Sequence, residues 1–243
     1  MLVTCATEAT PGLANEDFVV VGPHWAVVLD GATQRPGLDC GCAHGPGWLV
    51  RRLGGELAAR LSWDGPLPDV LAAAIKAVRD MHPECDLDNP DSPSTTVAMV
   101  RWEEEVEWLV LADSPILLES GGEVRVIRDD RVDRLPGYTA DAVRAARNSA
   151  DGFWVASTRP EAAYEALAGR ASGVGRVALL SDGAARLVER FGLMDWSGLL
   201  ELLDGAGPRE LIRRTRAAEA GDGDFPRGKR YDDATAVLVR LGR

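Results

Sequence analysis

Several aspartates of this chain stand directly at the ends of short apolar runs. Asp30 ends the run at residues 25–29 and is followed by Gly31, and Asp182, also followed by a glycine, comes after the run at residues 178–180. An apolar run of this length is typical of a buried strand, so its end would bring the carboxylate to the edge of a core. The glycine would let the backbone approach closely whatever the carboxylate holds. On its own, an Asp-Gly pair is more often a turn.

The pattern recurs, which favours a shared site over unrelated turns. Carboxylates stand at the ends of three further strand-like runs: Asp113, the pair Glu16 and Asp17, and the pair Asp232 and Asp233. Two carboxylates about 4 Å apart repel by roughly 4 kcal/mol at an effective dielectric of about 20. Four basic residues lie near them in the sequence: Arg176, Arg186, Lys229 and Arg230. A hard divalent cation is the simpler counter-charge, because sites built only from oxygen ligands suit Mg²⁺ or Mn²⁺.

The composition limits the classes of partner. The formal net charge is -11 over 243 residues, which argues against a surface for nucleic acid or for an anionic membrane. No apolar run approaches the ~20 residues of a membrane span, and the first residues lack the basic and long apolar regions of a signal peptide. Four cysteines in a chain of this length fit reduced thiols better than a disulfide framework. We therefore expect a cytoplasmic protein, and the high usage of Ala, Gly, Arg and Asp favours a GC-rich bacterial genome.

The hydrophobic periodicity predicts an α+β fold in a single domain, residues 1–243, since no linker or repeat divides the chain. Strands are expected at residues 2–7, 19–21, 25–29, 94–100, 106–111, 116–118, 124–127, 153–155, 177–180 and 236–241. Helices are expected at residues 48–61, 69–81, 141–148, 160–168, 184–191, 196–203 and 208–220. This order favours an antiparallel core that lies between helices.

Six short motifs in order along nearly the whole chain carry a family resemblance. They are Asn-Glu-Asp at residues 15–17, Asp-Gly at 30–31, Ser-Thr-Thr at 94–96, Ala-Asp-Ser at 112–114, Ser-Asp-Gly at 181–183 and Asp-Asp-Ala-Thr at 232–235. Together they resemble the motifs of the PPM-type (type 2C) metal-dependent serine/threonine protein phosphatases, and the chain looks like a bacterial single-domain member. Each motif is weak alone, and the full set in register is specific.

The resemblance implies a four-layer α-β-β-α sandwich with two central, mainly antiparallel sheets and a site for two Mn²⁺ or Mg²⁺ ions at one end. Asp30 would bridge both ions, and the carbonyl of Gly31 would bind one of them. Asp182 and Asp232 would complete the second ion. These three aspartates are the expected catalytic carboxylates.

The remaining carboxylates have supporting roles in the resemblance. Asp113 together with Asp182 could hold a third, weaker ion of the kind seen in bacterial members. Glu16 and Asp17 would hold metal-bound waters. Asp233 stands where the family has asparagine and would lie behind the ligands.

The implied activity is hydrolysis of phosphoserine or phosphothreonine in a phosphorylated protein substrate by a metal-activated water. That mechanism needs no nucleophilic side chain, which fits a sequence without another nucleophile motif. The alternative is a low-activity or inactive phosphatase-fold module that binds a phosphorylated partner. A phosphatase acting on a small phosphorylated metabolite is a third hypothesis.

The sequence departs from the family pattern at positions that affect substrate binding. Gly12 stands where the family usually has a phosphate-gripping arginine. Arg35 is a candidate substitute, although a solvated loop arginine is the simpler interpretation. Ala112 replaces a glycine of its motif, and Pro115 stands where an arginine often follows Asp-Ser.

Histidine offers a second candidate chemistry. Eukaryotic members have a histidine just after Asp-Gly that is proposed as a general acid, and His44 is expected at the start of the first helix. From there it could reach the leaving-group oxygen through water, and a packing or capping role is the alternative. His24 and His82 are expected at surface turns.

The loop that contains His44 is also a candidate soft-metal loop. Cys40, Cys42 and His44 are close in sequence, and zinc would need a fourth ligand, for which Cys85 or Cys5 is available.

Overall fold

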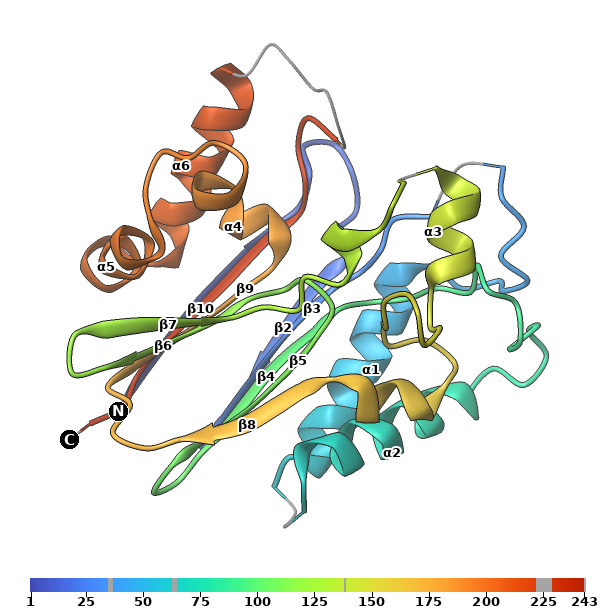
Figure 1. Ribbon diagram of the computed structural model, residues 1–243, viewed down its shortest axis with the longest axis horizontal. Helices are drawn as coiled ribbons and strands as arrows, with labels where there is room; N and C mark the ends of the chain where they lie inside the picture. Colours follow the sequence, from blue (N-terminus) through green and yellow to red (C-terminus); the bar gives the residue numbers. More distant parts are fainter. Residues whose placement is uncertain (35–36, 63–64, 138, 222–228, 243) are drawn as a thin grey trace.

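Two five-stranded antiparallel sheets form the centre of the computed structural model, which describes residues 1–34, 37–62, 65–137, 139–221 and 229–242 (Figure 1). Sheet I has the strand order β1 (Leu2–Glu8), β10 (Ala234–Arg240), β9 (Arg176–Leu180), β6 (Ile116–Ser120) and β7 (Glu123–Ile127). Sheet II has the order β2 (Asp17–Val21), β3 (Trp25–Asp30), β4 (Val97–Trp102), β5 (Val106–Leu111) and β8 (Leu167–Ala171).

Helices cover the outer face of each sheet, so the molecule has four layers (Figure 1). The helices α1 (Pro46–Arg60) and α2 (Leu67–Arg79) pack on sheet II. The helices α4 (Asp182–Glu189), α5 (Trp196–Ala206) and α6 (Pro208–Gly221) pack on sheet I. The shorter elements are η1 (Val132–Arg134), α3 (Ala140–Ala146) and η2 (Pro160–Glu165). This arrangement confirms the predicted α+β sandwich.

Three hydrophobic layers follow from the alternation of side chains along each strand. In β3, Trp25, Val27 and Leu29 pack with the helices α1 and α2. The residues between them, Ala26 and Val28, belong to the cluster that joins the two sheets. Because both faces of the central strands are covered, their sequences are continuous apolar runs, and a polar side chain can reach water only at a strand end.

Most predicted elements are present, and two predictions in the middle of the chain are wrong. The helix expected at residues 160–168 is a 3-10 turn, η2, followed by the edge strand β8. The sequence of β8, Leu-Ala-Gly-Arg-Ala, lacks the β-branched residues that favour a strand, and its pairing with β5 holds it there. Residues 153–155 form no strand and contribute one isolated bridge, between Arg147 and Phe153.

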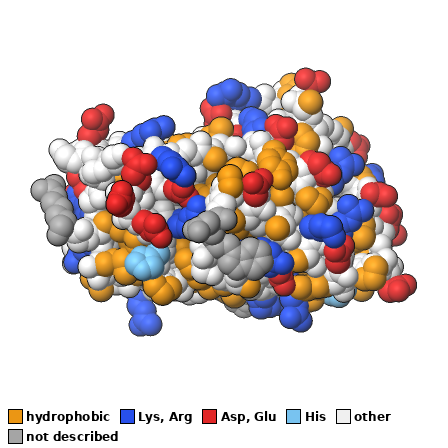
Figure 2. Space-filling view, turned by 90° about the horizontal axis from the view of Figure 1, so that it is seen from below, with side chains coloured by type: hydrophobic (Ala, Val, Ile, Leu, Met, Phe, Trp, Pro, Cys, Tyr) orange, Lys and Arg blue, Asp and Glu red, His pale blue; other side chains and the backbone are white. Residues whose placement is uncertain are grey.

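On the face shown in Figure 2, acidic and basic side chains are interspersed. No helix in the described part of the chain is long and apolar enough to cross a bilayer.

Candidate functional site

Asp30 lies at the end of β3 opposite a second carboxylate. In the β2–β3 hairpin, Asp17 and Asp30 are direct partners in the register. The backbone amide of Gly31 donates to the carbonyl of Glu16 at 3.1 Å, and a Cβ on Gly31 would lie 2.5 Å from that oxygen. Because the backbone of Glu16 approaches so closely, only glycine fits directly after Asp30.

The Ser-Thr-Thr segment at residues 94–96 fixes the backbone of Asp30. The Thr96 amide and the Thr95 hydroxyl both donate to the Asp30 carbonyl, at 2.9 and 2.8 Å. The Asp30 amide donates to the Thr96 hydroxyl at 3.2 Å. With its main chain held on both sides, Asp30 presents its side chain in one direction.

Asp182 comes to Asp30 from the other sheet. It is the first residue of α4, directly after β9, and its amide donates to Asp30 Oδ2 at 3.2 Å. The next residue, Gly183, passes so close to the carbonyl of Asp233 that a Cβ would lie 1.9 Å from that oxygen. The two glycines of the Asp-Gly motifs thus serve the same purpose, which is to bring backbone segments together around the carboxylates.

The Asp17 carboxylate is buried and poorly satisfied. Asp17 is only 5% exposed, and neither of its carboxylate oxygens has a hydrogen-bond partner in good geometry among the described residues. Burial, reinforced by the charges of Asp233 and Asp232, raises the pKa of Asp17 to about 7, and the nearby hydroxyls of Thr235 and Ser181 only partly offset the rise. A buried carboxylate of this kind is expensive to ionise without a cation.

The carboxyls of Asp30 and Asp182 also have raised pKa values. Burial raises the pKa of Asp30 well above its ordinary value, and the charges of Asp17, Asp182, Asp232 and Asp113 add to the rise. Burial followed by the charge of Asp232 raises the pKa of Asp182 to about 7. Carboxylates from both sheets therefore interact in one place.

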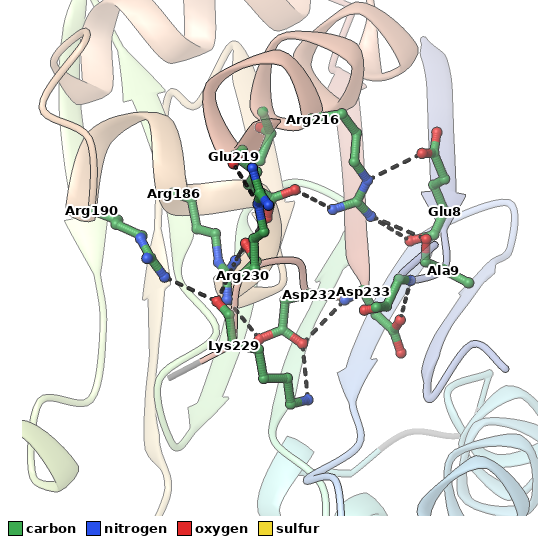
Figure 3. A network of polar contacts seen from close by, with 12 residues as sticks. Glu8, Ala9, Arg186, Arg190, Arg216, Glu219, Lys229, Arg230, Asp232 and Asp233 are labelled. Carbon is green, nitrogen blue, oxygen red and sulfur yellow. Dashed lines mark hydrogen bonds and ion pairs between the residues drawn. The ribbon is translucent and has the colours of Figure 1, made fainter. Parts of the chain in front are cut away.

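Asp232 differs from the others because two cations neutralise it. Arg186 donates to its Oδ2 at 2.8 Å, and Lys229 donates to its Oδ1 at 3.1 Å (Figure 3). Arg186 also pairs at 2.7 Å with Glu219, a fully buried residue of α6, which Arg216 contacts at 2.7 Å. Burial alone would lower the pKa of Lys229. The negative charges of Asp232, Asp30 and Asp182 outweigh that effect, so the pKa is raised and Lys229 remains a cation.

Asp233 and Glu16 tie the surrounding loops together. The amides of Thr10 and Glu16 each donate to the Asp233 carboxylate at 2.6 Å. The Thr33 hydroxyl donates to Glu16 Oε2 at 2.5 Å, and it accepts a hydrogen bond from Lys229 Nζ, also at 2.5 Å. Both carboxylate oxygens of Asp233 thus accept hydrogen bonds from backbone amides.

Asp113 follows a residue in an unusual backbone conformation. Ala112 has φ of 66°, in the left-handed region that glycine adopts more easily, which explains why the resembled motif has glycine there. Burial raises the pKa of Asp113, and the neighbouring Arg128 partly offsets this.

An open cleft of about 660 Å³ adjoins these carboxylates. Its lining residues are Asp182, Asp232, Asp133, Glu189, Arg128, Arg186, Arg190 and Lys229. The carboxylates suit a hard divalent ion, since all the donors are oxygens and the Asp17 oxygens lack well-aligned partners in the described part of the chain. The cations on the same cleft suit an anionic ligand.

The structure brings together most of the residues singled out from the sequence. The carboxylates of Asp17, Asp30, Asp113, Asp182 and Asp232 interact, and Gly31 and Glu16 adjoin them through the hydrogen bonds described above. Gly12 is exposed with φ of 82°, and Arg35 lies outside the described residues.

Of the basic residues near the carboxylates in sequence, Arg186 and Lys229 pair with Asp232. Arg176 lies at the other end of β9 and pairs with Glu119, Glu201 and Asp204.

His44 lies in a different environment from these carboxylates. Its Nδ1 is 3.5 Å from the sulfur of Cys42 and 3.7 Å from that of Cys85. His82, expected at a surface turn, is instead buried, with 7% of its surface exposed, and joins the same group. Its position was missed because nothing in the local sequence distinguishes a buried turn from an exposed one.

Sequence reasoning also missed several residues of the cleft. Arg128, Asp133 and Glu189 form ion pairs at 2.6 and 2.8 Å beside Asp113 and Asp182, and Glu219 lies behind Arg186. Arg128 follows β7 and Glu189 ends α4, so only the pairing of β6 with both β7 and β9 brings them to the site. The spacing of Arg216 and Glu219, three residues apart on a helix, was the one local signal of a buried ion pair.

Comparison of the sequence with protein-family models and with curated proteins found no match. The structure, in contrast, has the fold of the PPM-type phosphatases. It resembles the PPM Ser-Thr phosphatase MsPP from Mycobacterium smegmatis in complex with cacodylate, with a TM-score of 0.60 and 20% identity over 100% of this chain and 99% of that one. It also resembles the catalytic domain of the serine/threonine protein phosphatase PstP in complex with two manganese ions, with a TM-score of 0.61 and 20% identity over 98% and 96% of the two chains. A third similar structure is a C. elegans sex-determining protein, with a TM-score of 0.62 and 15% identity, of which this chain spans 64%.

Proposed function

We propose that residues 1–243 form a single PPM-type domain that hydrolyses phosphoserine or phosphothreonine in a phosphorylated protein with Mn²⁺ or Mg²⁺. The observation that carries the proposal is the convergence of buried carboxylates from both sheets, in which the Asp17 oxygens have no hydrogen-bond partner in good geometry among the residues that the structure describes. The PstP structure supports it because that protein, which has the same fold, binds two manganese ions.

In this proposal Asp30, Gly31, Asp182 and Asp232 hold two ions, and Asp113 contributes to a third. Such ions would lower the pKa of a water molecule and neutralise phosphoryl oxygens for in-line attack. Asp17 and Glu16 would accept hydrogen bonds from water at the site. The threonines at residues 95 and 96 keep Asp30 oriented during turnover.

The cations of the cleft supply the phosphate contacts for which Gly12 offers no side chain. Arg128, Arg190 and Lys229 all line the cleft beside Asp182 and Asp232. A guanidinium matches the geometry of two phosphate oxygens, and Lys229 carries a charge near both Asp232 and Thr33. We propose that these residues bind the phosphoryl group. The expected role of His44 as a proton donor remains a prediction.

A second candidate function is a module that binds a phosphorylated partner with little or no turnover. The observation that favours it is the pairing of both Asp232 oxygens with cations, Arg186 and Lys229, which a metal ion would have to displace.

Hydrolysis of p-nitrophenyl phosphate with and without Mn²⁺ separates the two functions. For an enzyme we expect turnover that requires Mn²⁺ and falls roughly 100-fold or more in Asp182→Asn, because a ligand contributes at least as much as the residues that orient it. The matched control is Asp80→Asn, which removes an exposed carboxylate that pairs with Lys76 on α2. Its activity should equal that of the unmodified chain.

Absence of turnover in a folded protein that binds Mn²⁺ would contradict the enzymatic proposal. Calorimetric titration with phosphopeptides would then test the binding module. If turnover is present, a panel of phosphopeptides and small phosphorylated metabolites identifies the substrate class, and faster hydrolysis of metabolites would contradict the protein-substrate assignment.

A further inference from the structure

Two cysteines and two histidines meet in a group that contains none of the carboxylates described above. Cys42, His44, His82 and Cys85 each offer one ligand atom, and these four atoms all lie within 4.8 Å of one another. Cys42 and His44 come from the loop before α1, and His82 and Cys85 from the turn that follows α2. These two segments are about forty residues apart in sequence. Both adjoin the helices that cover sheet II, and their cysteine and histidine ligands meet at one point.

The separations between these atoms fit a tetrahedral ion. Zinc–sulfur bonds of about 2.3 Å and zinc–nitrogen bonds of about 2.0–2.1 Å require sulfur and nitrogen atoms about 3.5–3.6 Å apart on a tetrahedron. The Sγ of Cys42 lies 3.5 Å from Nδ1 of His44 and 3.6 Å from Nδ1 of His82. The Sγ of Cys85 lies 3.7 Å from Nδ1 of His44. The same ring nitrogen of both histidines faces the sulfurs.

The backbone around the group holds the two segments together. The Asp86 amide donates to the Gly41 carbonyl at 2.8 Å. Gly41 has φ of 67°, and a Cβ there would lie 2.8 Å from the Cβ of Asp86, so only glycine permits this approach. The His44 amide points at the Cys42 sulfur, 3.4 Å away, which is a contact that stabilises a thiolate.

Packing limits the freedom of both imidazole rings. Trp48, in the first turns of α1, stacks on His44 with ring centroids 4.1 Å apart and meets the edge of His82 at 5.0 Å. His82 is buried and the other three ligands are half-buried. Ligands that are already oriented lose little side-chain entropy when an ion binds.

We propose that Cys42, His44, His82 and Cys85 form a structural zinc site. Two thiolates and two neutral imidazoles balance the charge of Zn²⁺ and fill its tetrahedral shell, which leaves no open position for catalysis. The site is therefore distinct in chemistry from the oxygen-only carboxylate site. Its consequence is structural: the ion fastens the segment directly before α1 against the turn that follows α2.

The test is reconstitution of the full chain with Co²⁺ and Zn²⁺ under reducing conditions. We expect one cobalt ion per chain to give the thiolate-to-cobalt charge-transfer band and the strong visible absorption of tetrahedral cobalt. Stoichiometric zinc should displace that spectrum. In protein loaded with one equivalent of zinc and no other divalent ion, chelation should lower the melting temperature of the unmodified chain by much more than that of Cys85→Ser, since both proteins retain the acidic site.

Matched variants separate this site from the acidic one. Cys5→Ser removes the exposed cysteine of β1 and should retain the cobalt band. Asp182→Asn should retain it as well, because only cysteine ligands produce the band. His82→Ala keeps both thiolates but has one ligand fewer, so it should bind cobalt at least about tenfold more weakly and show less than the full band at one equivalent of cobalt. His82→Cys, which supplies another zinc ligand, should restore the full band and so excludes simple misfolding as the cause.

A cobalt spectrum without thiolate character in the reduced, folded chain would overturn the proposal. Retention of the full band in both Cys85→Ser and His82→Ala would do the same. So would a Cys42–Cys85 disulfide, found by mass spectrometry, that re-forms in the presence of excess zinc.

Discussion

The most consequential single residue of the acidic site is Asp232, because each of its carboxylate oxygens already contacts a cation. Arg186 is fixed in place by the buried Glu219, whereas the Lys229 side chain is 45% exposed and comes from a loop. We therefore expect a divalent ion that binds Asp232 to displace Lys229 more easily than Arg186. In the proposed metal site, this competition would lower the affinity for the ion.

Removing Lys229 should strengthen metal binding. In Lys229→Met, the loss of a partly exposed competing charge should raise the affinity for Mn²⁺ by roughly two- to fivefold, in line with the energy of exposed ion pairs. Calorimetric titration with Mn²⁺ measures this change. The control is Lys76→Met, whose lysine pairs with Asp80 on α2. A weaker Mn²⁺ affinity in Lys229→Met would show that the lysine supports the metal site.

Arg186 has a structural task that Lys229 lacks. In Arg186→Met, the fully buried Glu219 would lose its ion pair with Arg186 and keep the one with Arg216, so we expect a loss of about 3 kcal/mol in the free energy of unfolding. Urea unfolding checks this value. Arg213→Met, which removes an exposed pair with Glu210, should leave the free energy of unfolding almost unchanged. Equal losses in the two variants would contradict the assignment.

At the scale of elements, the site depends on how closely α4 approaches the segment that enters β10. Ser181 and Thr235 exchange backbone and side-chain hydrogen bonds at 2.9 Å, which joins the start of α4 to the start of β10. Gly183 lies at that contact, where the carbonyl of Asp233 occupies the place of a side chain. The N-terminus of α4 can therefore bring Asp182 beside Asp232 only with glycine at this position.

Gly183→Ala should separate these elements. The methyl group would force the backbone apart and cost about 2–3 kcal/mol in the free energy of unfolding, as overpacking does in a core. It should also weaken Mn²⁺ binding, since Asp182 and Asp232 would move apart. Thermal unfolding and Mn²⁺ titration measure the two effects.

Gly205 provides the matched control, because it lies in α5 with nothing within 4 Å of its Cβ position. Gly205→Ala should be neutral or stabilise the helix by up to about 1 kcal/mol. A Gly183→Ala protein as stable as Gly205→Ala would mean that the contact with Asp233 is not tight in solution.

For the molecule as a whole, the convergence of carboxylates from both sheets opposes folding unless a cation is present. Asp17 and Asp30 belong to sheet II, and Asp182 follows a strand of sheet I, so packing the sheets brings like charges together. The apolar layer between the sheets supplies the opposing free energy. Folding and metal binding should therefore be coupled through these residues.

The pH dependence of stability tests this coupling. The pKa values of Asp17 and Asp182 rise from 3.8 to about 7, so the folded chain binds more protons than the unfolded chain between these values. The free energy of unfolding of the metal-free protein should then fall as the pH rises from about 4 to about 7. Urea unfolding in the presence of a chelator, at intervals over this range, measures the slope.

Two comparisons identify the origin of that slope. Asp182→Asn should reduce it, because the variant lacks one of the titrating carboxyls. Saturating Mn²⁺ should flatten or reverse it, because the ion favours the ionised forms. A metal-free protein that becomes more stable over the same pH range would show that these carboxyls are not buried together.

Local patterns in the sequence predict much of the fold and the identity of the carboxylates. Apolar runs such as residues 25–29 predict buried strands because both faces of such a strand need an apolar cover, and this information is local. An aspartate at the end of such a run, followed by glycine, is likewise a local pattern. The order of elements then favoured a sandwich of helices around sheets, and the motifs added the expectation of a metal site.

Which groups meet could not be predicted from the sequence, because proximity between distant segments depends on strand pairing and helix packing. The pairing of β6 with β9 and β7 placed Arg128 and Glu189 at the cleft, and the docking of α6 placed Glu219 behind Arg186. The strand β8 exists through its pairing with β5, although its sequence gave no strand signal. The packing of α1 against α2 likewise selected His82 and Cys85 as partners of Cys42 and His44, a choice that the spacing along the chain left open.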